Sequence, residues 1–160
     1  FLDSSWFKMG KGWLMPSCNF YQATGKDVID IANILKKFKE DLVDCDYPDI
    51  DNDKLNNFIL GMLKKGKIIC VKNLDDDKLI GVCIFYKTEY WWSKEQTMVI
   101  QLIYVLKKYR NYQVVKQLVD SVKQVAENLP ISLSIIAKLN ADKLLKRLGF
   151  EQMGNNWRLK

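Results

Sequence analysis

The residues with the clearest chemical potential lie in a basic turn between an apolar run and an amphipathic segment. The run from Val99 to Val105 is rich in β-branched and aromatic residues, which is typical of a buried strand. The turn covers 107–111, and from Val114 to Val122 apolar residues recur at three- and four-residue spacing, as in a helix. The start of a helix leaves backbone N–H groups unpaired at the positive end of its dipole. This strand–turn–helix junction therefore predicts a phosphate or pyrophosphate site.

The charges around this turn favour an anionic ligand. Cationic side chains gather near the predicted helix start at Lys107, Lys108, Arg110 and Lys116. The chain as a whole carries 25 Lys and Arg against 19 Asp and Glu, a net charge of +6. Its lysines are scattered rather than gathered in one long patch, so we favour an anionic cofactor over nucleic acid as the partner.

Other kinds of chemistry are excluded by the residue types. The chain contains no His, which excludes a Ser-His-Asp catalytic triad and a Cys-His catalytic dyad. No C-x-x-C pair and no zinc-finger spacing occur among the cysteines, which are Cys18, Cys45, Cys70 and Cys83. The acidic loop at 44–53 lacks the glycine and the final glutamate of a calcium loop: counted from Asp49, those positions hold Lys54 and Leu60. We expect no metal site.

The length and hydropathy of the chain indicate how many domains it forms and whether it contains a membrane segment. A chain of 160 residues with 48% hydrophobic residues is enough for one ordinary domain. It shows neither a signal-peptide core nor an apolar run long enough to span a membrane. The scattered cysteines fit small buried residues in a reducing compartment. We therefore expect a cytoplasmic protein without membrane contact, or a component of a viral particle if a phage encodes it.

The pattern predicts alternating strands and helices. Thr24 and Asp27 form a near capping box before a first helix, and Gly149 fits the left-handed position after a last helix ending at Arg147. The second helix is predicted at Asp53 to Lys65, and the last begins at Asn140. Strands are predicted at 17–23, 66–73, 78–87, 99–105, 131–136 and in the closing segment 156–160, with 66–73 and 78–87 as an antiparallel hairpin.

Two segments resemble the GNAT superfamily of acyl-CoA-dependent N-acetyltransferases. Positions 110–115, R-N-Y-Q-V-V, match its (Q/R)-x-x-G-x-(G/A) signature, with Gln113 and Val115 at the two small positions. The segment ADKLLKRLGF at 141–150 resembles its A-x-x-L-Y-E-K-L-G-F pattern, and the opening Ala-Thr-x-x-Asp is also similar. The resemblance implies an α/β (α+β) domain over 17–160. Its mixed, mostly antiparallel sheet has about six to seven strands and about four flanking helices, as in that family's fold.

The same resemblance implies acetyl-CoA as cofactor and an amine as acceptor, whose identity the sequence does not give. The implied cofactor-binding residues are Val105, Arg110, Asn111, Tyr112, Gln113, Val114, Val115, Lys116 and Asn140. The position of the general base in many family members aligns with Gln101, and Tyr104 lies on the same predicted strand. We take Gln101 and Tyr104 as the candidate catalytic positions, with Tyr86, Glu89 and Glu95 in reserve.

Departures from the family pattern keep a second hypothesis open. Gln101 is a neutral amide, the family's catalytic Tyr falls at Leu145, and its Asn falls at Lys138, close to Asn140. The chain is thus either an N-acetyltransferase or a catalytically degenerate domain that binds proteins or builds a structure. Its Lys-, Asn- and Ile-rich composition suits an AT-rich genome such as that of a phage.

Three surface features remain for the structure to place. Residues 1–16 form an aromatic N-terminal arm with Trp6, Phe7 and Trp13, which either folds over its own domain or docks on a protein partner. The adjacent Trp91 and Trp92 cannot both face one core from a strand, so at least one should cover a groove or a contact surface. The acidic loop either caps the next helix or, by family analogy, borders a cationic acceptor through Asp44, Asp46 and Asp49.

Overall fold

The sheet is the frame on which every other element is placed. A computed structural model describes residues 17–42, 46–134 and 141–154. In these residues five strands lie in the order in which they occur along the chain. All neighbouring pairs are antiparallel except the last, which is parallel. The strands are β1 (Cys18–Gln22), β2 (Lys67–Asn73), β3 (Leu79–Glu89), β4 (Gln96–Val105) and β5 (Ile131–Leu133).

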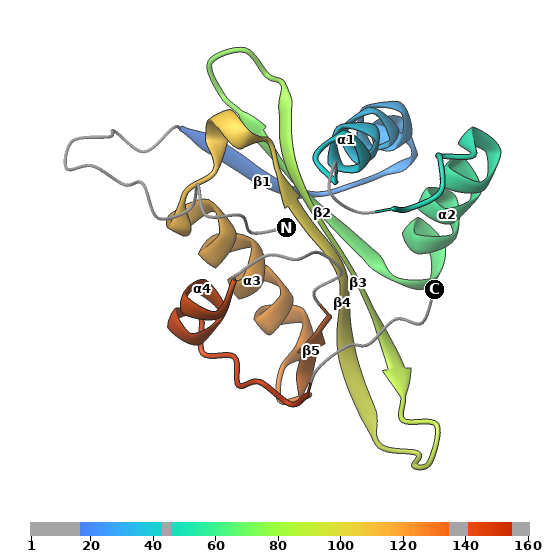
Figure 1. The fold of residues 1–160 in the computed structure, drawn as a ribbon, viewed down its shortest axis with the longest axis vertical. Helices are drawn as coiled ribbons and strands as arrows, with labels where there is room; N and C mark the ends of the chain where they lie inside the picture. The colour runs from blue at the N-terminus through green and yellow to red at the C-terminus, as the bar shows by residue number, and fades with distance from the viewer. Residues whose placement is uncertain (1–16, 43–45, 135–140, 155–160) are drawn as a thin grey trace.

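Helices cover both faces of this sheet (Figure 1). Their bounds are α1 (Val28–Glu40), α2 (Asn52–Lys65), α3 (Tyr112–Ala126) and α4 (Asp142–Arg147), with short 3-10 turns at η2 (Gly25–Asp27) and η3 (Lys107–Tyr109). One core cluster joins the sheet to α3 and α4, and a second joins it to α1 and α2. Because each face is covered, β2, β3 and β4 are buried almost throughout, as their apolar runs predict.

The capping residues read from the sequence predict several helix ends correctly. The Thr24 backbone N–H donates to the Asp27 carboxylate at 2.8 Å, as in the predicted capping box. Gly149 has a φ of +91° after α4, and the Phe150 N–H donates to the Leu145 carbonyl at 2.9 Å, which closes the helix in the Schellman manner. The acidic loop does cap α2, because the Asp51 carboxylate accepts the Lys54 N–H at 2.9 Å.

The predicted fold class is confirmed, with a difference in strand number. The sheet is mixed and mostly antiparallel and is flanked by four α-helices, but its described residues form five strands rather than six or seven. The closing strand expected at 156–160 and the aromatic arm at 1–16 lie outside the described residues, so both stay predictions. The strand predicted at 131–136 ends earlier than expected, because β5 stops at Leu133 and Ser134 is not part of a strand, while 135–136 lie outside the described residues.

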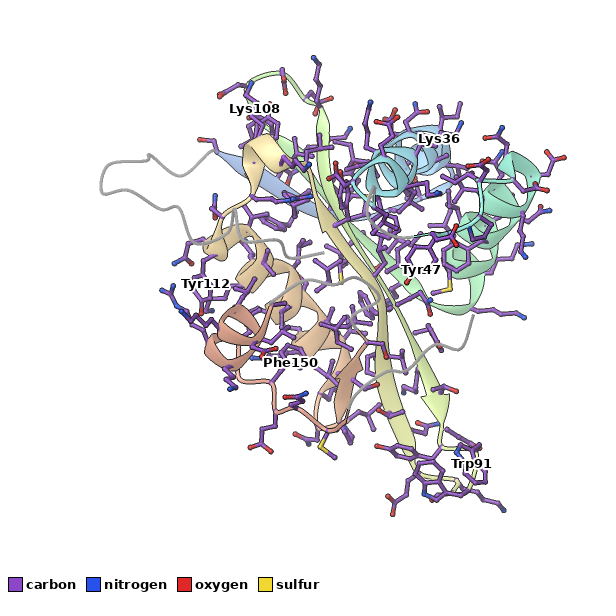
Figure 2. The ribbon with its side chains drawn as sticks, in the orientation of Figure 1. Lys36, Tyr47, Trp91, Lys108, Tyr112 and Phe150 are labelled. Atoms are coloured by element: carbon purple, nitrogen blue, oxygen red, sulfur yellow. The ribbon has the colours of Figure 1, made fainter. Side chains whose placement is uncertain are left out.

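The hairpin of β3 and β4 is longer than the sequence suggests. Pairing continues to Glu89 opposite Gln96, which shortens the predicted loop of 88–96 to 90–95. Trp91 and Trp92 lie at its tip, 91% and 65% exposed, and Figure 2 shows Trp91 far from the helices. The Trp92 ring lies 5.0 Å from that of Tyr90 and 5.1 Å from that of Trp91, measured between centroids. The two tryptophans thus form a small, exposed aromatic cluster with Tyr90, and the contact surface predicted for them stays a prediction.

A β-bulge in β4 changes which side chains face which helices. Ile84 pairs with Leu102 whereas Phe85 pairs with Ile100, so Gln101 is an extra residue in its strand. Before it, the even-numbered Met98 and Ile100 belong to the α3/α4 cluster. After it, that cluster takes the odd-numbered Ile103 and Val105, while Leu102 and Tyr104 face α1 and α2. The bulge therefore reverses the alternation of the strand at its midpoint.

The remaining groups give little sign of metal or thiol chemistry. In the described residues Cys70 and Cys83 are buried free thiols and Cys18 is half-buried. Burial raises the pKa of Cys70 to about 12, so this thiol is protonated at neutral pH. No group of three or more Cys, Asp or Glu able to hold a metal ion occurs in the described ranges. None of the helices described is long and apolar enough to cross a membrane.

Candidate functional site

The predicted pyrophosphate turn is present at the start of α3. Asn111 is the N-cap, and its side-chain oxygen accepts the Val114 N–H at 2.9 Å. The Val115 N–H reaches the Asn111 carbonyl at 3.4 Å. The backbone N–H groups of Tyr112 and Gln113 have no acceptor within the described part of the chain. Two donors at the positive end of a long helix are thus available to an anion.

The described pairing of β4 with β5 ends before this turn. It covers Met98 to Ile100, whereas β4 continues to Val105. The exposed Gln101 follows the last described pair, and Figure 1 shows β5 beside only one end of β4. The end of β4 thus leads from Gln101 to the turn at the start of α3.

The bulky residues in the phosphate signature do not fill the turn equally. Val114 and Val115 are 2% and 0% exposed and belong to the α3/α4 core cluster. Their side chains therefore point into the core, away from the end of the helix. Gln113 is exposed. Of the two residues that replace the small positions of the signature, Gln113 is thus the one that a ligand would meet, and its amide can donate a hydrogen bond.

Arg110 is turned inward. Its side chain is 2% exposed, its Nε donates to the Val105 carbonyl at 2.7 Å, and its guanidinium forms an ion pair with Asp41 at 2.8 Å. The signature arginine thus braces the turn instead of reaching out to a ligand. Asp41, the C-cap of α1, had no marker in the sequence, since nothing in its spacing links it to residue 110.

The other predicted cations differ in what they contact. Lys107 lies 3.3 Å from Asp41, and Lys116 lies 2.5 Å from Asp120 one turn along α3. Lys108 lies over the ring of Tyr109, 5.4 Å from its centroid, and Figure 2 shows it on the turn between β4 and α3. Exposed ion pairs are weak, so these lysines still contribute positive charge, but less than the sequence alone suggests.

The two candidate catalytic residues, Gln101 and Tyr104, differ in their exposure to solvent. Gln101 is exposed just after the described β4–β5 pairing ends, whereas Tyr104 is 2% exposed and faces α1 and α2. The Tyr104 hydroxyl donates to Asp41 at 2.9 Å. Burial, and then the hydrogen bond to Asp41, raise the pKa of Tyr104 well above its usual value. The hydroxyl is therefore a protonated donor that already has an acceptor.

A cation that the sequence reasoning missed lies beside the helix start. The guanidinium carbon of Arg147, at the end of α4, lies 3.8 Å from the centroid of the Tyr112 ring. The Tyr112 hydroxyl in turn donates to the Arg147 carbonyl at 3.5 Å. Figure 2 shows Tyr112 near the start of α3, toward α4. The two residues are far apart in sequence, so only the packing of α4 against α3 brings this charge to the turn.

The structure describes some of the remaining predicted site residues but not all of them. Leu145, which takes the position of the family's catalytic Tyr, packs against the α3/α4 core cluster. Val105 is fully buried in the same cluster, and its carbonyl is the acceptor for Arg110. Asn140 and Lys138 lie outside the described residues, so the role expected for Asn140 stays a prediction.

Comparisons with known proteins agree with this geometry. A predicted acetyltransferase from Clostridium acetobutylicum, solved with acetyl-CoA, is 18% identical, with a TM-score of 0.71 over 90% of this chain and 96% of that one. An aminoglycoside 6'-N-acetyltransferase from Acinetobacter baumannii is 16% identical, with a TM-score of 0.68 over 90% and 97%. A ribosomal-protein-alanine N-acetyltransferase from Brucella melitensis is 16% identical, with a TM-score of 0.65 over 90% and 99%. At these identities the likeness shows the fold.

The sequence itself supplies the family. No curated protein matches the chain significantly. The model of the acetyltransferase (GNAT) family, however, matches residues 29–150, which is well over half of the 160 residues. This stretch runs from the start of α1 to the end of α4 and so includes both β4 and the turn at the start of α3. The chain therefore belongs to the acetyltransferase (GNAT) family.

Proposed function

We propose that this protein transfers an acetyl group from acetyl-CoA to an amine. The observation that carries the proposal is the pair of available N–H groups, of Tyr112 and Gln113, at the start of α3. A helix start of this kind suits a pyrophosphate such as that of coenzyme A. Membership of the GNAT family supports the same cofactor.

Each of these residues has a definite task. The backbone donors of Tyr112 and Gln113 would hold the pyrophosphate, and Arg147 would add a positive charge beside them. Acetyl-CoA, when bound, supplies a thioester that is open to attack by an amine. Gln101 is a neutral amide that cannot take the proton of the amine. The protein therefore contributes proximity and orientation, and the amine would react in its uncharged form. The new C–N bond would form as the C–S bond of the thioester breaks, and the departing thiolate would take the proton that the amine loses.

The acceptor is proposed to be an amine that is attached to a cationic molecule. Asp46 and Asp49 are exposed in the connection between α1 and α2 and favour such a partner by charge. Two of the solved neighbours are named for the amino groups of an aminoglycoside and of a ribosomal protein, which supports an amine acceptor. Asp44 lies outside the described residues.

Binding of CoA provides the first test. A ligand that binds only the folded state stabilises it, by about 2.7 kcal/mol at a concentration 100 times the dissociation constant. CoA at that concentration should therefore raise the melting temperature by about 5–10 °C. Arg147→Gln should weaken CoA binding about tenfold, because it removes a charge-assisted contact. Thermal unfolding with and without CoA measures the first effect, and calorimetric titration with CoA measures the second.

Lys146→Gln is the matched control, since it removes the same charge from the neighbouring exposed position of α4. It should bind CoA as wild type does. Equal losses in the two variants would show that only the overall charge matters. If millimolar CoA stabilises neither the wild type nor the control, the enzyme proposal fails, and the alternative of a catalytically degenerate binding module takes its place.

The acceptor class has its own test. Spermidine is a suitable probe because it is a polyamine whose binding depends on charge and weakens with salt. Asp46→Asn combined with Asp49→Asn should reduce spermidine binding about fivefold, at roughly 0.5 kcal/mol for each lost charge. The control is Asp75→Asn combined with Asp77→Asn, which removes the same charge from the exposed β2–β3 turn. Unchanged binding in the first pair would return the acidic loop to the single role of capping α2.

A further inference from the structure

We infer that Asp41 is a positioning residue that fastens the end of α1 to the turn at the start of α3. The inference rests on the proposed function, because that turn is the proposed pyrophosphate site. It concerns the contact between Asp41 and Arg110, which are 69 positions apart in the sequence. Asp41 touches none of the signature residues except Arg110 and would act through it.

The contacts converge on one carboxylate. Asp41 Oδ2 accepts from the Arg110 guanidinium at 2.8 Å and from the Tyr104 hydroxyl at 2.9 Å. Asp41 Oδ1 lies 3.3 Å from the Lys107 ammonium. Tyr104 lies at the end of β4, Lys107 lies in η3, and Arg110 directly precedes the N-cap of α3. One side chain thus holds the turn at both of its ends.

Arg110 completes the brace. Its Nε donates to the Val105 carbonyl at 2.7 Å, so the guanidinium links the end of β4 to Asp41. The side chain is 2% exposed, and a buried guanidinium needs both a counter-charge and acceptors. The bulge at Gln101 is what turns Tyr104 toward α1 and makes the third contact geometrically available.

The location of Asp41 argues against a chance contact. It is the C-cap of α1, where the helix dipole disfavours a carboxylate. The positive charges of Arg110 and Lys107 offset that cost, and they come from the turn itself. The preceding turn of α1 also holds the connection to α2, since Lys39 Nζ donates to the Tyr47 carbonyl at 3.0 Å. The proposed acceptor side and the proposed cofactor turn therefore share one anchor.

Hydrogen exchange of the unliganded protein tests the positioning role directly. Asp41→Asn keeps the shape of the side chain but removes the charge that Arg110 requires. The amides of 106–116 should then exchange about tenfold faster, because the turn opens more easily. Glu40→Gln is the matched control, since it makes the same change of charge one residue earlier, where Glu40 pairs only with the exposed Lys37. Exchange that is no faster than in Glu40→Gln would overturn the inference.

Binding of CoA adds a second test, in which a gain or a loss of affinity in Asp41→Asn distinguishes an effect of charge from a positioning role. Asp41→Asn leaves more positive charge at the turn, so an effect of charge alone would strengthen the binding of an anion. A positioning role requires the reverse, and we expect CoA to bind about tenfold more weakly than to Glu40→Gln. Tighter binding would overturn the inference. If neither the wild type nor the control binds CoA, the proposed function fails, while the exchange experiment still decides the role of Asp41.

Tyr104→Phe covers the case in which Asp41→Asn does not fold. It removes one hydrogen bond to Asp41 and leaves the ion pair with Arg110 and the net charge unchanged. Exchange of 106–116 should rise in the same direction but by a smaller factor, about threefold. No change would show that Tyr104 only fills the core, and the inference that this cluster holds the turn would be overturned.

Discussion

Deletion of Gln101 is expected to remove the bulge of β4 and to leave every core side chain of the strand on its present face. Gln101 is the extra residue of the bulge, so in the deletion variant Leu102 follows Ile100 directly. Regular alternation then keeps Ile100, Ile103 and Val105 toward α3 and α4, and Leu102 and Tyr104 toward α1 and α2. The variant should therefore still fold cooperatively, with a loss in the free energy of unfolding of about 0.5–3 kcal/mol.

The measurement is thermal unfolding followed by circular dichroism, with the dispersion of amide signals as a second probe. Gln101→Ala is the control, because it keeps the bulge and changes only an exposed side chain. It should alter the free energy of unfolding by less than about 0.5 kcal/mol. A deletion variant that no longer melts cooperatively would show that the core positions of β4 depend on the extra residue itself.

Arg110→Ala is expected to lower the free energy of unfolding by about 3 kcal/mol. The substitution removes a side chain that is 2% exposed and leaves both Asp41 and the Val105 carbonyl without their main donor. A carboxylate deprived of its partner at a helix C-terminus is costly, since the dipole also disfavours it. Urea denaturation measures the loss. The sequence pattern alone would assign the substitution to cofactor binding, whereas the structure predicts an effect on the free protein.

Lys108→Ala is the matched control for Arg110→Ala. It removes the same charge from the same turn, but Lys108 is exposed, so the cost should stay below about 0.5 kcal/mol. Asp41→Ala combined with Arg110→Ala should cost less than the sum of the two single changes, by at least about 1 kcal/mol, because the partners are lost together. Additive costs would show that the ion pair contributes nothing of its own.

The sequence by itself determined the elements and their order. The change from β-branched runs to helical spacing marks β4 and α3, and the glycine after α4 marks the end of that helix, because these are effects of nearby residues on the local backbone. The same local patterns carry the likeness to the GNAT family at 110–115 and 141–150, which the family model confirms. The helix start at Asn111 likewise depends only on a short polar side chain three residues before the N–H that it accepts.

Only the tertiary structure decided what the charged side chains of the site do. Arg110 carries the same charge whether it binds a ligand or a partner within the fold, and its choice depends on Asp41, which folding brings to it from 69 residues away. The bulge at Gln101 follows from the register with β3, so neither β4 nor β3 shows it alone. Arg147 reaches Tyr112 because α4 packs beside α3. Such contacts follow from packing between distant elements, and spacing along one chain does not encode them.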